Sequence, residues 1–279
     1  SHSAVRLLAG SRSGAVLLGG IAIQLQPGWK TYWRTPGDSG VPPRFDFSKS
    51  ENVEAVTVMW PAPMKFDDGA GGFSLGYKQQ VVLPLRIVAK SVDKPLTLRA
   101  EINYAVCDRL CIPVEASTEL TFASVASTQD SALSAALDTV PKPAAIGDPN
   151  PLTIRDVKRA GKSTVLVDVT AADGRDLSLF VEGPTPDWAL PIPKLVENGP
   201  PGVKRFAFEL DGLPPPQVAA AILGFARNFW STAEPAWRLK LGEARRLTVK
   251  GGFAALAAAG HAALPDDLAI RIADRFTTY

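Results

Sequence analysis

The sequence is poor in the side chains that most catalytic and metal sites use. Its 279 residues contain only two cysteines, two histidines and two methionines. Two cysteines are too few for a disulfide-rich scaffold. Neither histidine lies near them in the chain, because His2 is at the terminus and His261 is in an Ala-rich stretch. Two thiolates need further ligands to hold a metal. We therefore expect no metal site, no cofactor and no histidine-dependent hydrolase.

Long apolar runs and a surplus of charge are also missing. A membrane-spanning helix needs roughly 18 apolar residues, and the longest candidates, 15–25 and 253–264, are shorter. The start of the chain shows no charged stretch followed by an apolar core, as a signal peptide would. Thirty Lys and Arg against 28 Asp and Glu leave a net charge of +2, without a basic run. We expect this chain neither to bind nucleic acid nor to insert into a membrane.

The turn-forming residues and the apolar pattern predict an all-β fold. The chain contains 24 prolines and 23 glycines, which favour frequent turns. Apolar residues alternate with others over 21–25, 81–87 and 96–106, as in antiparallel β-sandwiches. The expected organisation is a first β-sandwich domain at 1–125, a Pro/Ala-rich linker at 126–150 with a short helix near 131–137, and a second β-sandwich domain at 151–279 with a helical or irregular C-terminal segment.

The two cysteines, Cys107 and Cys111, lie four residues apart. In a continuous strand that separation would place them about 13 Å apart, whereas a disulfide needs Cα atoms within about 7 Å. A hairpin whose turn is Asp108, Arg109 and Leu110 would bring them together. Both cysteines are in phase with the polar residues of their strands. We therefore expect both sulfurs to point away from the core and to be accessible, as thiol–disulfide exchange requires.

A purely structural disulfide is the alternative to an exchange site. Closing such a small ring restricts the unfolded chain by only about 2 kcal/mol, and a β-sandwich of this size does not depend on that contribution. The polar phase of both cysteines favours exchange, but a local clip on a hairpin stays open. In that case the chain is a non-catalytic binding module of two immunoglobulin-like domains. A copper-handling domain is a further alternative, although neighbouring Met or His ligands are missing from the sequence.

Three stretches of the chain resemble the DsbD N-terminal domain family. The hairpin segment is Tyr104-Ala-Val-Cys107-Asp-Arg-Leu-Cys111-Ile-Pro113-Val-Glu115. The stretches 27–40, Pro-Gly-Trp-Lys-Thr-Tyr-Trp-Arg-Thr-Pro-Gly-Asp-Ser-Gly, and 60–68, Trp-Pro-Ala-Pro-Met-Lys-Phe-Asp-Asp, resemble the family's aromatic strand and its cap-loop segment. The short cysteine spacing followed by Ile-Pro is similar to ScsB-type members. The resemblance covers residues 4–125 in detail and extends weakly over the second domain.

The resemblance implies an immunoglobulin-like domain in the bacterial periplasm, as part of an inner-membrane protein. Such a domain alternates between disulfide and dithiol. It is reduced by a thioredoxin-like domain of the same full-length protein, after electrons cross the membrane through a multi-helix domain. It then reduces periplasmic thioredoxin-fold partners, which are disulfide isomerase-like or ScsC-like proteins. Carried over to this chain, Cys111 forms the mixed disulfide and Cys107 resolves it.

Further residues are candidates for modulating the cysteine site. Arg109 would favour a thiolate, whereas a nearby Asp67 or Asp68 would oppose it. Phe66 and Phe73 flank a Gly-rich loop and are the two candidates for a cap aromatic. A flexible loop of this kind over the sulfurs would restrict non-specific oxidation. The aromatic pair Tyr32 and Trp33 belongs either to the core or to the site.

Overall fold

The computed structural model divides the chain into two units, residues 1–141 and 142–279. It describes residues 2–67, 71–122, 127–142, 144–161, 163–171, 177–182, 190–196, 199–210 and, by backbone alone, 269–274. Within these residues no helix is both long and apolar enough to cross a membrane. The predicted all-β fold of antiparallel sheets is confirmed.

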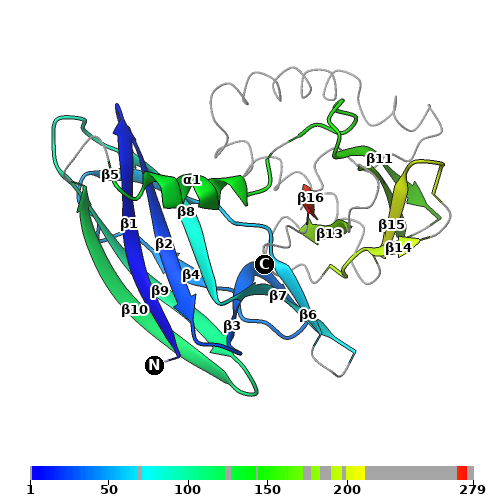
Figure 1. Cartoon of the computed structure of the whole chain (residues 1–279), viewed down its shortest axis with the longest axis horizontal. Helices are drawn as coiled ribbons and strands as arrows, with labels where there is room; N and C mark the ends of the chain where they lie inside the picture. Colours follow the sequence, from blue (N-terminus) through cyan, green and yellow to red (C-terminus); the bar gives the residue numbers. More distant parts are fainter. Residues whose placement is uncertain are drawn as a thin grey trace. The chain divides into compact units, whose positions relative to one another are not determined.

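Two antiparallel sheets form the first unit (Figure 1). One has the order β1-β2-β8-β5, with bounds Ser3–Ser13, Val16–Leu25, Gln80–Ala89 and Val53–Val58. The other has the order β10-β9-β3-β7-β6, with bounds Cys111–Phe122, Leu96–Cys107, Lys30–Gly37, Phe73–Lys78 and Met64–Asp67. The short strand β4 (Arg44–Asp46) also pairs with β9.

The alternation read from the sequence places the core between these sheets. On β9 the residues of one phase are buried, namely Leu96, Leu98, Ala100, Ile102, Tyr104 and Val106. The buried residues of the other sheet include Ile21 of β2 and Leu83, Leu85 and Ile87 of β8. Strand β10 is less covered than β9, and its Ile112 is 37% exposed. β10 is the edge strand of its sheet, so fewer neighbours cover it.

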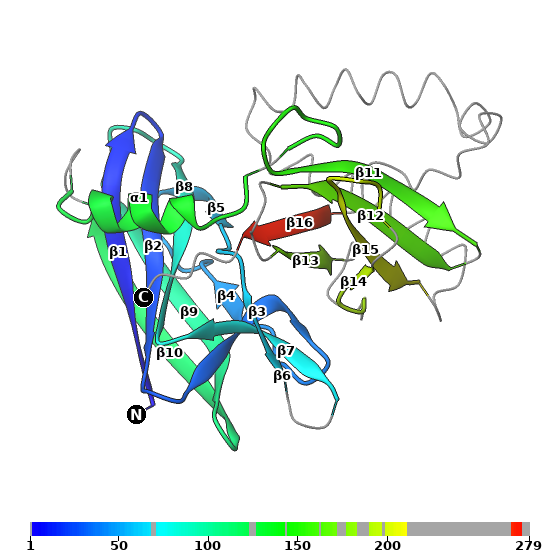
Figure 2. The ribbon, with the colours of Figure 1, turned by 45° about the vertical axis from the view of Figure 1, so that its right-hand side comes forward.

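The short helix expected near 131–137 is present as α1 (Asp130–Asp138), and it belongs to the first unit. It lies across the outer face of β1, β2 and β8 (Figures 1 and 2). Its Leu133 is fully buried above two glycines, since a Cβ on Gly10 or Gly20 would come within 2.7 or 2.6 Å of the Leu133 side chain. The side chain of Asp130 also accepts a hydrogen bond from the Ser11 backbone N–H of β1.

The second unit has a four-stranded antiparallel sheet of order β11-β12-β15-β14. These strands are Thr153–Ala160, Thr164–Thr170, Lys204–Glu209 and Lys194–Val196. A separate antiparallel pair joins β13 (Leu177–Glu182) to β16 (Ala269–Asp274). Val165, Val167, Phe206 and Phe208 are buried together on one face of the larger sheet. The expected helical or irregular segment before β16 lies outside the described residues.

Candidate functional site: a disulfide hairpin

A disulfide joins Cys107, the last residue of β9, to Cys111, the first residue of β10. The two residues are direct partners in the register of the hairpin, with Cα atoms 4.2 Å apart. Asp108, Arg109 and Leu110 form the turn between them, and the Asp108 N–H donates a hydrogen bond to the Leu110 carbonyl at 3.2 Å. The three-residue turn expected from the sequence is therefore present. The hairpin end projects beyond the neighbouring strands (Figures 1 and 2).

The two sulfur-bearing residues differ in exposure. Cys111 is exposed, but Cys107 is only 1% exposed. The expectation that both cysteines are accessible is therefore wrong for Cys107. The reason is that β3 pairs with the end of β9, with Lys30 opposite Cys107, and a side chain of β3 covers this face of β9. Tyr32, two residues further on β3, forms a buried cluster with Ala105 and Cys107.

The Tyr32 hydroxyl contacts both sulfurs. It donates a hydrogen bond to Cys107 Sγ at 2.9 Å and lies 3.3 Å from Cys111 Sγ. Burial raises the pKa of Tyr32, so the phenol stays protonated and remains a donor at neutral pH. When the disulfide opens, this donor faces the sulfur that becomes a buried thiolate, which it would stabilise.

A tight turn after β3 holds the Tyr32 ring in place. The chain passes so close beneath the ring that a Cβ built on Gly40 would lie 2.8 Å from Tyr32 Cδ1 and 2.3 Å from Pro36 Cβ. Only glycine fits this approach without displacing a neighbour. Trp33, next to Tyr32 on the strand, is 1% exposed and lies in the core. Adjacent strand residues point to opposite faces, so one aromatic of the pair serves the site and the other the core.

The other candidates lie around the hairpin or on the β6–β7 hairpin. Arg109 is exposed in the cysteine turn, beside Asp108. The register places Phe66 on the same face of the sheet as the cysteines. Its strand β6 is the third strand from β9, which corresponds to a distance of about 14 Å. The Phe66 ring packs under two ammonium groups, Lys30 Nζ at 5.3 Å and Lys78 Nζ at 4.9 Å from its centroid.

Two other cap-loop candidates, Phe73 and Asp67, lie away from the cysteines. Phe73 pairs with Asp67 in register, so both are on the opposite face of the sheet from Phe66. Asp67 forms an exposed ion pair with Lys65, at 3.3 Å. Asp68 lies outside the described residues. Among the described residues, the aromatic that covers the cysteines is thus Tyr32, whose hydrogen bonds the sequence did not predict.

The segment around the start of strand β7 contains a pattern that is typical of hydrolases. Residues 72–76, Gly-Phe-Ser-Leu-Gly, have the Gly-x-Ser-x-Gly spacing of a hydrolase nucleophile elbow. Such an elbow requires an exposed serine on a strand-to-helix turn. Ser74 is instead fully buried within β7, and its Oγ accepts a hydrogen bond from Lys30 Nζ at 3.0 Å. This serine is therefore a structural residue.

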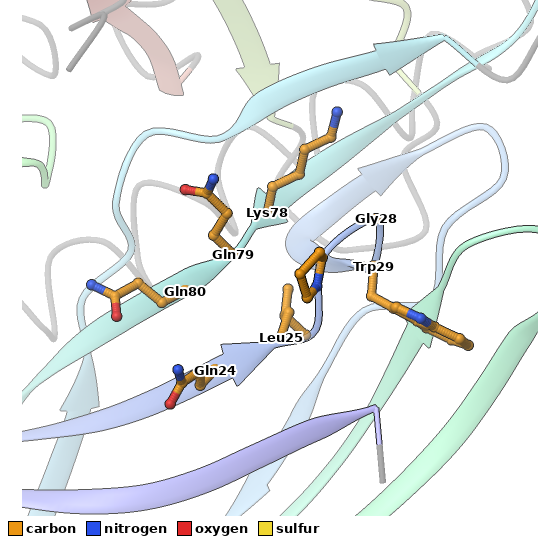
Figure 3. Close-up of a pocket in the computed structure, with 8 residues that line it drawn as sticks. Gln24, Leu25, Gly28, Trp29, Lys78, Gln79 and Gln80 are labelled. Atoms are coloured by element: carbon orange, nitrogen blue, oxygen red, sulfur yellow. The ribbon is translucent and has the colours of Figure 1, made fainter. Parts of the chain in front are cut away.

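A surface depression of about 600 Å³ lies beside the turn between β2 and β3 (Figure 3). Its lining residues are Gln24, Leu25, Pro27, Gly28, Trp29, Lys78, Gln79 and Gln80. This lining has neither a thiol nor a carboxylate, and Lys78 is its one ionisable side chain, so it offers no acid–base pair. Among the described residues no group of three or more His, Cys, Asp or Glu could hold a metal ion. The chemistry of the described residues is thus concentrated at the disulfide.

Comparison with known proteins agrees with this geometry. Residues 8–123 match the family model of the N-terminal domain of the thiol:disulfide interchange protein DsbD. The resemblance to the DsbD N-terminal domain family is confirmed. The family match lies within the first unit and includes the whole disulfide hairpin, Tyr32 and Gly40. A search of curated proteins found no match.

A solved structure extends the similarity beyond the DsbD N-terminal domain. The chain is similar to the N-terminal periplasmic domain of ScsB from Proteus mirabilis, with 25% sequence identity and a TM-score of 0.59. The alignment covers 74% of this chain and 79% of that chain. The first unit holds 141 of the 279 residues, which is about half. The similarity therefore includes part of the second unit.

Proposed function

We propose that the first unit is a periplasmic protein-disulfide reductase domain in which Cys111 exchanges disulfides with partner proteins and Cys107 resolves them. The general assignment to thiol–disulfide interchange rests on the DsbD family match and the disulfide. The division of roles rests on one observation, the unequal exposure of the two cysteines. An incoming sulfur can approach exposed Cys111, whereas Cys107 is buried under the donor of Tyr32.

Reduction of the domain proceeds in two exchanges. A thiolate of the upstream donor attacks Cys111 Sγ, forms a mixed disulfide and releases Cys107 as a thiolate. The donor's second thiolate then attacks the donor's first sulfur, which is bonded to Cys111 in the mixed disulfide. This forms a disulfide within the donor and releases Cys111 as a thiolate. Because a leaving thiolate of lower pKa leaves faster, the Tyr32 hydrogen bond to Cys107 assists the first exchange. Two electrons pass to the domain, and the donor becomes a disulfide.

Reduction of the partner reverses these roles. The Cys111 thiolate attacks the partner's disulfide, and the partner's first thiolate leaves. Cys107 then attacks Cys111 Sγ, releases the partner's second thiolate and restores the Cys107–Cys111 bond. In both directions bond exchange with the outside occurs at Cys111, and Cys107 only leaves or returns. The described residues can perform this cycle without a histidine or a cofactor, since exchange depends on thiolate fraction, leaving-group pKa and access.

We further propose the direction of electron flow implied by the family. Electrons would come from a thioredoxin-like domain and a membrane domain of the same full-length protein. They would go to periplasmic thioredoxin-fold proteins of the disulfide isomerase or ScsC type. The similarity to a domain that is described as periplasmic in ScsB supports the location. The second unit would space or dock the redox unit.

Trapping of mixed disulfides tests the roles. The Cys107→Ala variant should accumulate mixed disulfides with a disulfide-bonded thioredoxin-fold protein, because the resolving thiol is missing. The Cys111→Ala variant should form few, because its remaining thiol is buried. The opposite result would reverse the assignment. The reduction potential separates exchange from a structural clip: a value between about −270 and −120 mV supports a redox carrier, and one below about −300 mV supports a binding module with a structural disulfide.

A further inference from the structure

The turn of the disulfide hairpin presents an exposed apolar side chain. Leu110 is 77% exposed, the largest exposed fraction among the large hydrophobic residues that the structure describes. It directly precedes Cys111, the exposed cysteine, and Ile112 follows at 37% exposure. The exchange cycle proposed above makes no use of either residue. Burial of such a side chain by a partner would be favourable.

The geometry of exchange places Leu110 inside any mixed-disulfide interface. A partner sulfur bonded to Cys111 lies about 2 Å from Cys111 Sγ. The Cα atoms of Leu110 and Cys111 are only about 3.8 Å apart, as consecutive residues. A protein that approaches Cys111 closely enough for sulfur exchange therefore also meets Leu110, because the hairpin end projects from the sheet (Figure 2).

The turn also holds Leu110 in a fixed position before any partner binds. The disulfide closes the turn, and the Asp108 N–H bonds to the Leu110 carbonyl. A turn whose backbone is fixed in advance loses less conformational entropy on binding. The flanking Asp108 and Arg109 are exposed and of opposite charge, so the apolar tip has a polar surround, as in the centre of protein interfaces.

We propose that Leu110 is a docking residue that selects protein partners with an apolar recess beside their reactive cysteine. This inference rests on the proposed exchange function. It adds that the hairpin discriminates between protein thiols and small thiols, because a small reagent reaches Cys111 without covering Leu110. A protein occupant is favoured because the exchange brings a sulfur to Cys111, and of the molecules that carry one, a protein surface is broad enough to cover Leu110 as well.

The test compares two reductants of the same chain. Reduced thioredoxin serves as the protein probe and dithiothreitol as the small probe, and the rate of disulfide opening is measured for both. Leu110→Ser should slow reduction by thioredoxin about tenfold or more, and reduction by dithiothreitol less than twofold. Leu110→Met, which keeps an apolar side chain, should restore most of the thioredoxin rate. Val92→Ser is the matched control, since Val92 is 51% exposed and precedes β9 at the end remote from Cys107.

Each outcome has a distinct meaning. Selective loss of the thioredoxin reaction in Leu110→Ser, with rescue by Leu110→Met, supports the docking role. The proposal is overturned by equal effects on both reductants, by no effect on thioredoxin, or by a wild-type chain that reacts no faster with thioredoxin than with dithiothreitol. A disulfide that neither reductant opens would instead refute the exchange function itself.

Discussion

Replacement of Tyr32 by phenylalanine isolates the hydrogen bond that the structure places at the buried sulfur. The change removes only the hydroxyl that lies 2.9 Å from Cys107 Sγ and leaves the ring that covers Cys107. A hydrogen bond to a charged group contributes about 1.5–3 kcal/mol, and one pKa unit corresponds to 1.36 kcal/mol. We therefore expect the pKa of the Cys107 thiol in the reduced chain to rise by about one to two units.

The rate of disulfide opening should fall for the same reason. Cys107 is the leaving group when a thiolate attacks Cys111, and a thiol of higher pKa leaves more slowly. If the logarithm of the rate falls by about one half for each unit by which the pKa of the leaving thiol rises, the rate should fall roughly three- to tenfold. The assay is stopped-flow reduction by dithiothreitol at pH 7, combined with thiol titration of the reduced chain by ultraviolet absorbance of the thiolate.

Tyr104→Phe is the matched control for this experiment. Tyr104 is also buried on β9, but its hydroxyl bonds to Ser3 Oγ at 2.7 Å. Tyr104→Phe should thus lose similar stability and retain the wild-type rate and thiol pKa. If Tyr32→Phe also retains both, or if the two variants slow equally, the Tyr32 hydroxyl has no role at the sulfur and the ring serves only as packing.

Three further substitutions test the surroundings and the fold. Gly40→Ala should slow disulfide opening as Tyr32→Phe does, because the new Cβ would lie 2.8 Å from the Tyr32 ring; an unchanged rate in the same stopped-flow assay contradicts this. Leu133→Ala should lower the free energy of unfolding by about 3 kcal/mol, measured by urea denaturation with exposed Ser134→Ala as control, and a loss below about 1 kcal/mol would show that α1 contributes little. Arg205→Gln removes the bidentate partner of buried Asp168, at 2.6 and 2.7 Å. Arg205 holds the pKa of Asp168 below its usual range. The pair therefore stabilises the fold fully at pH values above the pKa that Asp168 has in the unfolded chain. This stabilisation is lost as the pH falls through the lower pKa that Asp168 has in the folded chain. The variant should be about 2 kcal/mol less stable at pH 7, and the difference should shrink at pH 3; a constant difference between the two pH values argues against the ion pair.

Local patterns in the sequence predicted the strands and the disulfide hairpin, because these features depend on residues that are close in the chain. The alternation on β9 and the four-residue cysteine spacing lead directly to the hairpin, because strand period and disulfide reach are local constraints. The exposure of Cys107 could not be read in this way. It depends on β3, which pairs with β9 across more than 70 residues of sequence. A polar phase indicates solvent only where no side chain from a neighbouring strand covers it.

The aromatic pair Tyr32-Trp33 shows where sequence reasoning reaches its limit. Strand geometry requires the two side chains to face opposite ways, so one of them had to leave the core. The sequence does not say which one, because both residues are large aromatics that suit a core. In the structure both are indeed buried. The register decides: Thr31 pairs with core residue Val106 and Lys30 with Cys107. Every second residue from Lys30 then belongs to the cysteine side, which assigns Tyr32 to the sulfurs. A one-residue slip of β3 would bring Trp33 to Cys107 in place of Tyr32, so the register of a single strand determines whether a phenol hydroxyl lies at this disulfide.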